Sequence, residues 1–178
     1  IADRMIAEFE DQIRARIGHY VFGQDKDVIE DVLATWLREH EAKIAVSETG
    51  IDGAITARLR DVNGADVLAV AQNYDNPAAL QQALGVNSSP SLRDLAQAAA
   101  ETLYHQADVA ATIAVVTRPD VDESADADEG TAVAIYTPEK THARTYGFGG
   151  KSENVRTWVS NWSMAWLWRT LREAPNAG

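Results

Sequence analysis

The sequence of residues 43–64 is KIAVSETGIDGAITARLRDVNG, and this stretch decides the fold class. Lys43–Ser47 is a short apolar run that predicts a buried strand, and the next three residues, Glu48-Thr49-Gly50, predict a turn. Four apolar residues then recur at helical spacing before Asn63-Gly64: Ala54, Ile55, Leu59 and Val62. A buried strand followed by a glycine-containing turn and a helix is typical of an α/β domain.

The same alternation continues on both sides of this stretch. We predict further helices at about residues 27–37, 77–84, 91–103 and 151–172, from their apolar spacing and their capping residues. We predict further strands at Val67–Ala71 and Val109–Val116, and a hairpin of Thr131–Tyr136 and His142–Tyr146. This order favours helices on both faces of a mixed sheet. On the last helix, Trp158, Trp162 and Trp166 share one face and predict core packing, whereas Trp168 falls off that face and predicts a subunit contact.

The first residues form a separate pattern. Met5, Ile6, Phe9, Ile13 and Ile17 recur at three- and four-residue steps, which predicts an amphipathic helix before Gly18. We place a boundary near Gly23, so that residues 1–23 form a linker helix and residues 24–178 form the main α/β domain. Because the chain begins with Ile1, we expect it to be the continuation of a longer protein.

Composition excludes several classes of function. The chain has no cysteine, which excludes disulfides, thiolate nucleophiles and cysteine-based zinc sites. A net charge of −11 without a basic stripe argues against nucleic-acid binding. No run of eighteen apolar residues and no signal peptide are present, so we expect a cytoplasmic protein without a membrane span.

The segment Ser47–Gly53 is the first candidate site. It follows the carboxyl end of a predicted strand and precedes a helix N-terminus, which is where α/β sheets bind ligands and where free N–H groups bind phosphate. The candidate ligand-binding residues here are Ser47, Glu48, Gly50 and Gly53. An ordinary turn is the alternative interpretation, because Gly and Asp are also common turn residues.

Several short stretches follow one another in a recognisable order. They are Ser47–Gly53, Asp61–Gly64, Tyr74–Asn76, Gly85–Val86, Val115–Pro119, Gly130–Val133 and Phe148–Arg156. Together they resemble the C-terminal amidohydrolase domain of the CinA family, which includes the stand-alone PncC nicotinamide mononucleotide deamidases. That domain carries motifs like A-E-S-C-T-G-G, D-I-x-G, Y-S-N-x-x-K, G-V, G-I-A-G-P, V-G-T-V and F-x-G-D-R-x-x-V-R. Upstream, Ile13–Gly18 and Tyr20–Gly23 are similar to a segment like I-R-x-R-L-G-x-x-I-Y-G that precedes the domain in full-length CinA.

The resemblance implies a three-layer α/β/α domain and a site for hydrolysis of the carboxamide of nicotinamide mononucleotide. Family members use a serine nucleophile with a nearby lysine and tyrosine. Counted without gaps from Asp61, the serine position falls on Thr49 and the lysine position on Ala79, while Tyr74 is retained. A second register places Ser47 at the serine but requires two extra residues in the following helix. The catalytic candidates are therefore Thr49 and Tyr74.

Thr117 and Arg156 complete the candidate ligand-binding set, because they lie in the stretches similar to G-I-A-G-P and V-R. We expect a diverged domain with lost or much reduced deamidase activity that retains a ligand-binding or assembly role. The alternatives are an active amidohydrolase that uses Thr49 or Ser47, and a structural dimerisation module. We expect a nucleotide-like small molecule as ligand, a homo-oligomer and no cofactor.

The acidic stretch at residues 120–129 invites comparison with a calcium-binding loop. An EF-hand loop requires Gly at its sixth position and Glu at its twelfth, where this sequence has Ala125 and Thr131. We therefore expect a solvated loop and no metal site.

Overall fold

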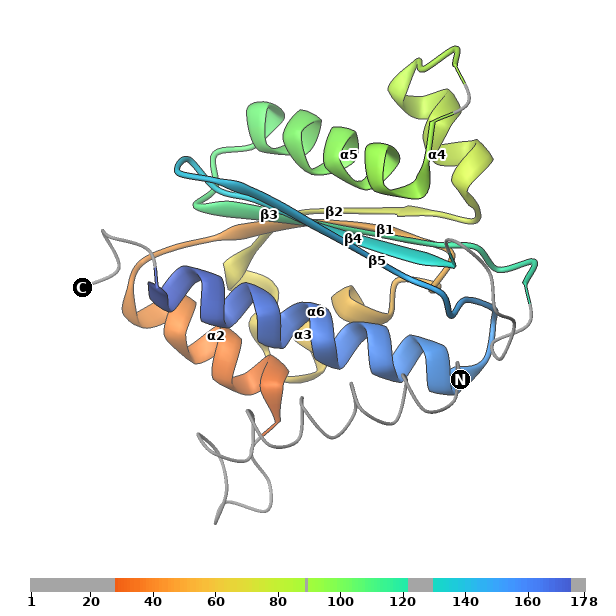
Figure 1. Ribbon diagram of the computed structural model, residues 1–178. Helices are drawn as coiled ribbons and strands as arrows, with labels where there is room; N and C mark the ends of the chain where they lie inside the picture. The colour runs from red at the N-terminus through yellow and green to blue at the C-terminus, as the bar shows by residue number, and fades with distance from the viewer. Residues whose placement is uncertain (1–27, 89, 122–129, 174–178) are drawn as a thin grey trace.

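The computed structural model describes residues 28–88, 90–121 and 130–173, and Figure 1 shows them as one layered domain. The predicted linker helix at residues 1–23 and residues 122–129 of the acidic stretch lie outside the described residues. The elements are α2 (Ile29–Glu39), β1 (Ile44–Thr49), α3 (Ala54–Asp61), the short 3₁₀ helix η1 (Gly64–Val67), β2 (Leu68–Tyr74), α4 (Pro77–Leu84), α5 (Leu92–Gln106), β3 (Ala111–Thr117), β4 (Thr131–Tyr136), β5 (Thr141–Tyr146) and α6 (Glu153–Glu173).

The sheet has five strands in the order β2-β1-β3-β4-β5. β1 pairs in parallel with β2 and β3, and β4 pairs antiparallel with β3 and β5. The predicted mixed sheet and hairpin are therefore confirmed. The carboxyl ends of β1, β2 and β3 lie together at one end of the sheet, along the strand direction. The turn between β4 and β5 lies at the opposite end.

Helices cover both faces of the sheet: α4 and α5 pack on one face, and α2, α3 and α6 on the other (Figure 1). The predicted three-layer α/β/α fold is thus confirmed. Each face has its own core. Small residues such as Ala96, Ala100 and Ala114 bring α5 close to the sheet, whereas Leu33, Met164 and Leu167 contribute to the larger core on the other side.

β1 extends further than the sequence predicts. Glu48 and Thr49 were expected in a turn, but they continue the strand and pair with Asn73 and Tyr74 on one side and with Val115 and Val116 on the other. The prediction was wrong because it depended on apolar residues alone. Parallel partners on both sides bury these two polar residues completely.

Trp168 also departs from its prediction. It is only 8% exposed and belongs to the core on the α2 side of the sheet, so the expected subunit contact is wrong. α6 packs against the sheet and against α2 at the same time, which buries side chains outside the main apolar face. Trp162 and Trp166 are buried as predicted, while Trp158 is half-buried against the same core.

Among the described residues, no helix combines the length and the apolar character that crossing a bilayer requires.

Candidate functional site

The turn between β1 and α3 has an unusual backbone. Gly50, Asp52 and Gly53 all have positive φ angles, of 80°, 54° and 67°. The Gly50 amide donates a hydrogen bond to the Tyr74 carbonyl at 2.9 Å. A Cβ atom at Gly50 would lie 2.1 Å from the Thr117 carbonyl oxygen, so only glycine allows the turn to pack directly on the end of β3.

Glu48 holds the start of α3. Its carboxylate is fully buried and accepts hydrogen bonds from the Ile55 amide at 2.6 Å, from the Thr56 amide at 3.1 Å and from the Thr56 hydroxyl at 2.7 Å. The N-cap residue of α3 is Gly53, which has no side chain to accept from these donors, so Glu48 supplies the cap from β1. Burial raises the pKa of Glu48 above its ordinary value, although the three donors oppose this shift.

Thr49, the predicted nucleophile, lies on the other side of the sheet. Its side chain is completely buried, and its Oγ1 atom forms no hydrogen bond within the described residues. Ser47, two residues earlier on the same face, is 1% exposed, and its hydroxyl is also without a partner there. Tyr74 pairs with Thr49 across the strands, but its hydroxyl donates to Gln72 at 3.3 Å.

The remaining predicted residues have contacts within the protein. The Thr131 hydroxyl donates to the Phe148 carbonyl at 2.9 Å, which leaves its oxygen to accept from the Thr117 hydroxyl at 3.1 Å. The Arg156 guanidinium donates to the Asp52 carboxylate at 3.2 Å and to the Lys151 carbonyl at 3.1 Å. Arg156 therefore connects the start of α6 to the turn after β1.

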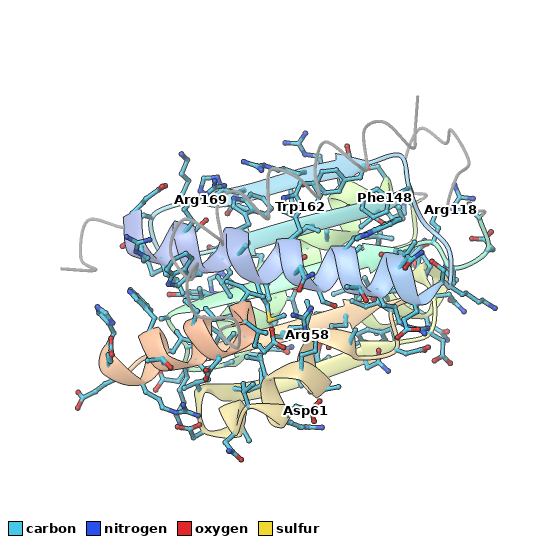
Figure 2. The ribbon with its side chains drawn as sticks, turned by 90° about the horizontal axis from the view of Figure 1, so that it is seen from below. Arg58, Asp61, Arg118, Phe148, Trp162 and Arg169 are labelled. Atoms are coloured by element: carbon cyan, nitrogen blue, oxygen red, sulfur yellow. The ribbon has the colours of Figure 1, made fainter. Side chains whose placement is uncertain are left out.

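An open cavity of about 660 Å³ lies beside this turn, at the edge where the parallel strands end. Its lining comes from the starts of α4 and α5, the segment after β3 and the segment before α6: Asn76, Pro77, Ala78, Gln81, Pro90, Leu92, Leu95, Arg118, Pro119, Asp120 and Lys151. None of the predicted site residues lines this cavity. Figure 2 shows Arg118 and Phe148 toward the same end of the molecule.

Two basic side chains, Arg118 and Lys151, and one acidic side chain, Asp120, line the cavity. The Arg118 Nε atom lies 3.8 Å from an Asp120 oxygen. The cavity also adjoins two helix N-termini, where Asn76 and Ser91 accept hydrogen bonds from the Ala79 and Asp94 amides. Cations and helix N-termini favour an anionic group, while leucine and proline side chains favour an apolar one.

Sequence reasoning missed this cavity because its lining comes from four separate segments. The available signals were Arg118 directly after a predicted strand and Asn76-Pro77 at a predicted helix start. The described residues contain no group of three or more His, Asp or Glu side chains that could hold a metal ion.

These features define a class of protein: a three-layer α/β/α domain with a mixed sheet and a cavity where its parallel strands end. No family model matches the chain. It is 28% identical to a CinA-like protein of Geotalea daltonii, over 98% of this chain and 44% of that protein. It is 26% identical to a CinA-like protein of Thermomicrobium roseum, over 97% of this chain and 41% of that protein.

Solved structures show the same fold. The competence or damage-inducible protein from Enterobacter asburiae matches with a TM-score of 0.66 at 18% identity, over 82% of this chain and 99% of that one. A CinA superfamily protein from Enterobacter cloacae matches with a TM-score of 0.65 at 20% identity, over 83% of this chain and 95% of that one. The chain is therefore similar to CinA-like proteins along nearly its whole length, and it spans less than half the length of the curated relatives named above.

The packing of Gly50 can be tested against a glycine of similar φ in open space. Gly85 has a φ of 72° and nothing within 4 Å of an added Cβ atom. Gly85→Ala should lower the free energy of unfolding by about 1–2 kcal/mol, the usual cost of a left-handed alanine. Gly50→Ala should cost at least about 2 kcal/mol more, because its Cβ meets a backbone carbonyl. Equal losses in urea denaturation would contradict the close packing.

Glu48→Gln should lower the free energy of unfolding by about 1–3 kcal/mol at neutral pH, because an amide cannot accept from all three donors. The raised pKa of Glu48 adds a pH dependence. The stability that comes from this pKa shift is complete below the ordinary value of 4.5, and it is lost as pH rises through the folded-state pKa. The difference between wild type and Glu48→Gln should therefore shrink as pH rises, as measured by urea denaturation.

The matched control is the exposed Glu101→Gln, whose stability difference from wild type should vary much less with pH. A Glu48→Gln difference that grows with pH would show that the donors outweigh burial.

Proposed function

We propose that this chain is a diverged CinA-type domain that has lost deamidase activity and retains a binding cavity for a nucleotide-like, phosphorylated small molecule. The observation that carries the proposal is the state of Thr49. A nucleophilic hydroxyl must reach the substrate and must transfer its proton to a base. The Thr49 hydroxyl is completely buried, and no described residue is hydrogen-bonded to it.

The family's lysine has no counterpart that could act as the base. Ala79 occupies that position in the ungapped alignment, and its backbone amide takes part only in capping α4. The alternative register does not restore the chemistry, since Ser47 is as buried as Thr49 and its hydroxyl also has no partner among the described residues. Tyr74 remains next to Thr49, but one tyrosine does not replace a serine and a lysine.

The cavity beside the turn supports a retained binding role. Pro119 lines the cavity and its Cδ atom would lie 3.5 Å from a Gly50 Cβ, so the cavity is next to the turn that carries the family motif. Arg118 and Lys151 supply positive charge for a phosphate, and Leu92 and Leu95 supply apolar surface for a ring. A volume of about 660 Å³ suits a mononucleotide.

The test uses nicotinamide mononucleotide with the chain of residues 1–178. We expect no enzymatic release of ammonia, because loss of a general base alone costs about 10²- to 10⁴-fold in rate. We expect measurable binding by calorimetry, weakened about three- to tenfold by Arg118→Gln or Lys151→Gln. Arg60→Gln, which alters an exposed residue of α3 away from the cavity lining, should bind like wild type.

Two results would overturn the proposal. Ammonia release that Thr49→Ala or Ser47→Ala abolishes would show a working amidohydrolase. Absence of binding would rule out a retained binding role for the cavity, and so would binding that Arg118→Gln and Lys151→Gln leave unchanged.

A second candidate role is assembly, and the edge strand β2 favours it. Leu68–Tyr74 contains no charged residue and no proline, which are the usual features that keep an edge strand from pairing with another chain. The other edge strand, β5, carries His142 and Arg144. We propose that β2 pairs with its own copy across a two-fold axis, as closed homodimers do.

Ala71→Lys tests this pairing, because Ala71 is exposed and a lysine there guards the edge without entering the core. Sedimentation velocity should show a dimer for the wild type and a monomer for Ala71→Lys. A wild type that is monomeric at all concentrations would rule out the assembly role.

A further inference from the structure

A second concave site lies at the end of the sheet opposite the first cavity. The connection between β4 and β5 lies at that end, because β4 runs antiparallel to β3. Figure 2 shows Arg169 and Arg118 toward opposite ends of α6. The site is a cavity of about 340 Å³ between the connection, β5 and the last turns of α6.

Three cations from three different elements line this cavity: Lys140 from the connection, Arg144 from β5 and Arg169 from α6. Neither Lys140 nor Arg144 forms an ion pair within the described part of the chain. Glu139 and Glu173 also line the cavity, so cations outnumber carboxylates there. The excess of basic side chains here is opposite to the composition of the whole chain, which has 27 acidic and 16 basic residues.

Arg144 is held in place by the aromatic residue below it. Its guanidinium carbon lies 4.4 Å from the centre of the Trp166 ring, and Trp166 is only 6% exposed. His142 contacts the same ring edge-on at a centroid distance of 6.0 Å. The ring therefore has no open face on which a nucleobase could stack, and the cavity offers mainly charged and hydrogen-bonding groups.

His142 reports the sign of the local potential. Partial burial lowers its pKa, and Lys140 and Arg144 lower it further, while Glu173 opposes them. The cations on two neighbouring elements thus outweigh the carboxylate on α6 at the position of the imidazole. A net charge of −11 on the whole chain does not remove this positive region, because screening limits distant charges.

We propose that the cavity formed by Lys140, Arg144 and Arg169 binds a diphosphate group and recognises it by charge. Arginine presents a planar fork of donors that matches phosphate oxygens, and a lysine adds a mobile point charge. The group could be free pyrophosphate or the diphosphate of a nucleotide, since both offer the same oxygens. The proposal is independent of the first cavity, because the two sites share no residue.

Calorimetry with inorganic pyrophosphate and the chain of residues 1–178 tests the proposal. Lys140→Gln and Arg144→Gln should each weaken binding by about tenfold, the usual effect of losing one charge-assisted hydrogen bond. Lys140→Gln serves as the second variant, because Lys140 is exposed and its replacement leaves the Trp166 packing intact. Arg60→Gln should bind like wild type. In the double variant Arg118→Gln/Lys151→Gln, which removes the cations of the first cavity, Lys140→Gln and Arg144→Gln should still weaken binding by about tenfold.

A nuclear magnetic resonance titration of His142 gives a site-specific readout. A bound anion should raise the pKa of His142, so that pyrophosphate binds more tightly as pH falls through that pKa. Measured by the His142 signal, adenosine 5′-diphosphate should bind within about threefold of pyrophosphate, because no aromatic face in this cavity is open to its base.

Three results would overturn the proposal: no binding at millimolar pyrophosphate, binding that Lys140→Gln and Arg144→Gln both leave unchanged, or an unchanged pKa of His142 at saturation. Adenosine 5′-diphosphate that binds far more tightly than pyrophosphate, as measured by the His142 signal, would overturn recognition by charge alone.

Discussion

The hydrogen bonds between the Glu48 carboxylate and the first turn of α3 connect the centre of the sheet to the helix that follows it. The carboxylate is fully buried and accepts from two amides and one hydroxyl. A buried carboxylate is costly unless it is hydrogen-bonded, and helix N-terminal amides are costly if left unpaired, so each group offsets the cost of the other. The turn between β1 and α3 must then be short, and three of its residues have positive φ angles.

This interaction also decides the environment of Thr49. Successive residues of a strand point to opposite faces, so a Glu48 side chain directed at α3 places Thr49 and Ser47 under α4 and α5. On that side β2 and β3 flank both residues, and both hydroxyls are buried without partners among the described residues. The direction of the Glu48 side chain and the burial of Thr49 therefore have one cause, the alternation of β1.

Apolar periodicity and turn residues are local signals. They allowed the prediction of a mixed sheet with helices on both faces and of the hairpin at its C-terminal side. It did not predict that β1 continues through Glu48 and Thr49, because their burial depends on Asn73, Val115 and their neighbours, which are distant in the chain. Trp168 was misplaced for a similar reason, since α2 covers a side of α6 that periodicity assigns to the surface. The cavity residues Arg118 and Lys151 could not be paired from the sequence, because only the packed loops bring them together.

Close backbone contacts bring those loops together, in addition to the hydrogen bonds of the Thr117 and Thr131 hydroxyls. A Cβ atom at Gly149 would lie 2.9 Å from the Gly130 carbonyl oxygen and 3.0 Å from the Arg118 carbonyl oxygen, and the Gly150 amide donates to that same Arg118 oxygen. The segments after β3, before β4 and after β5 are therefore in contact through their main chains. This contact fixes the positions of Arg118 and Lys151 without requiring a particular side chain at either place. The main chain of these segments builds this end of the sheet, while the side chains of Arg118 and Lys151 face the cavity. Side chains that face the cavity can therefore change in such a domain while the main-chain contacts that hold this end of the sheet persist.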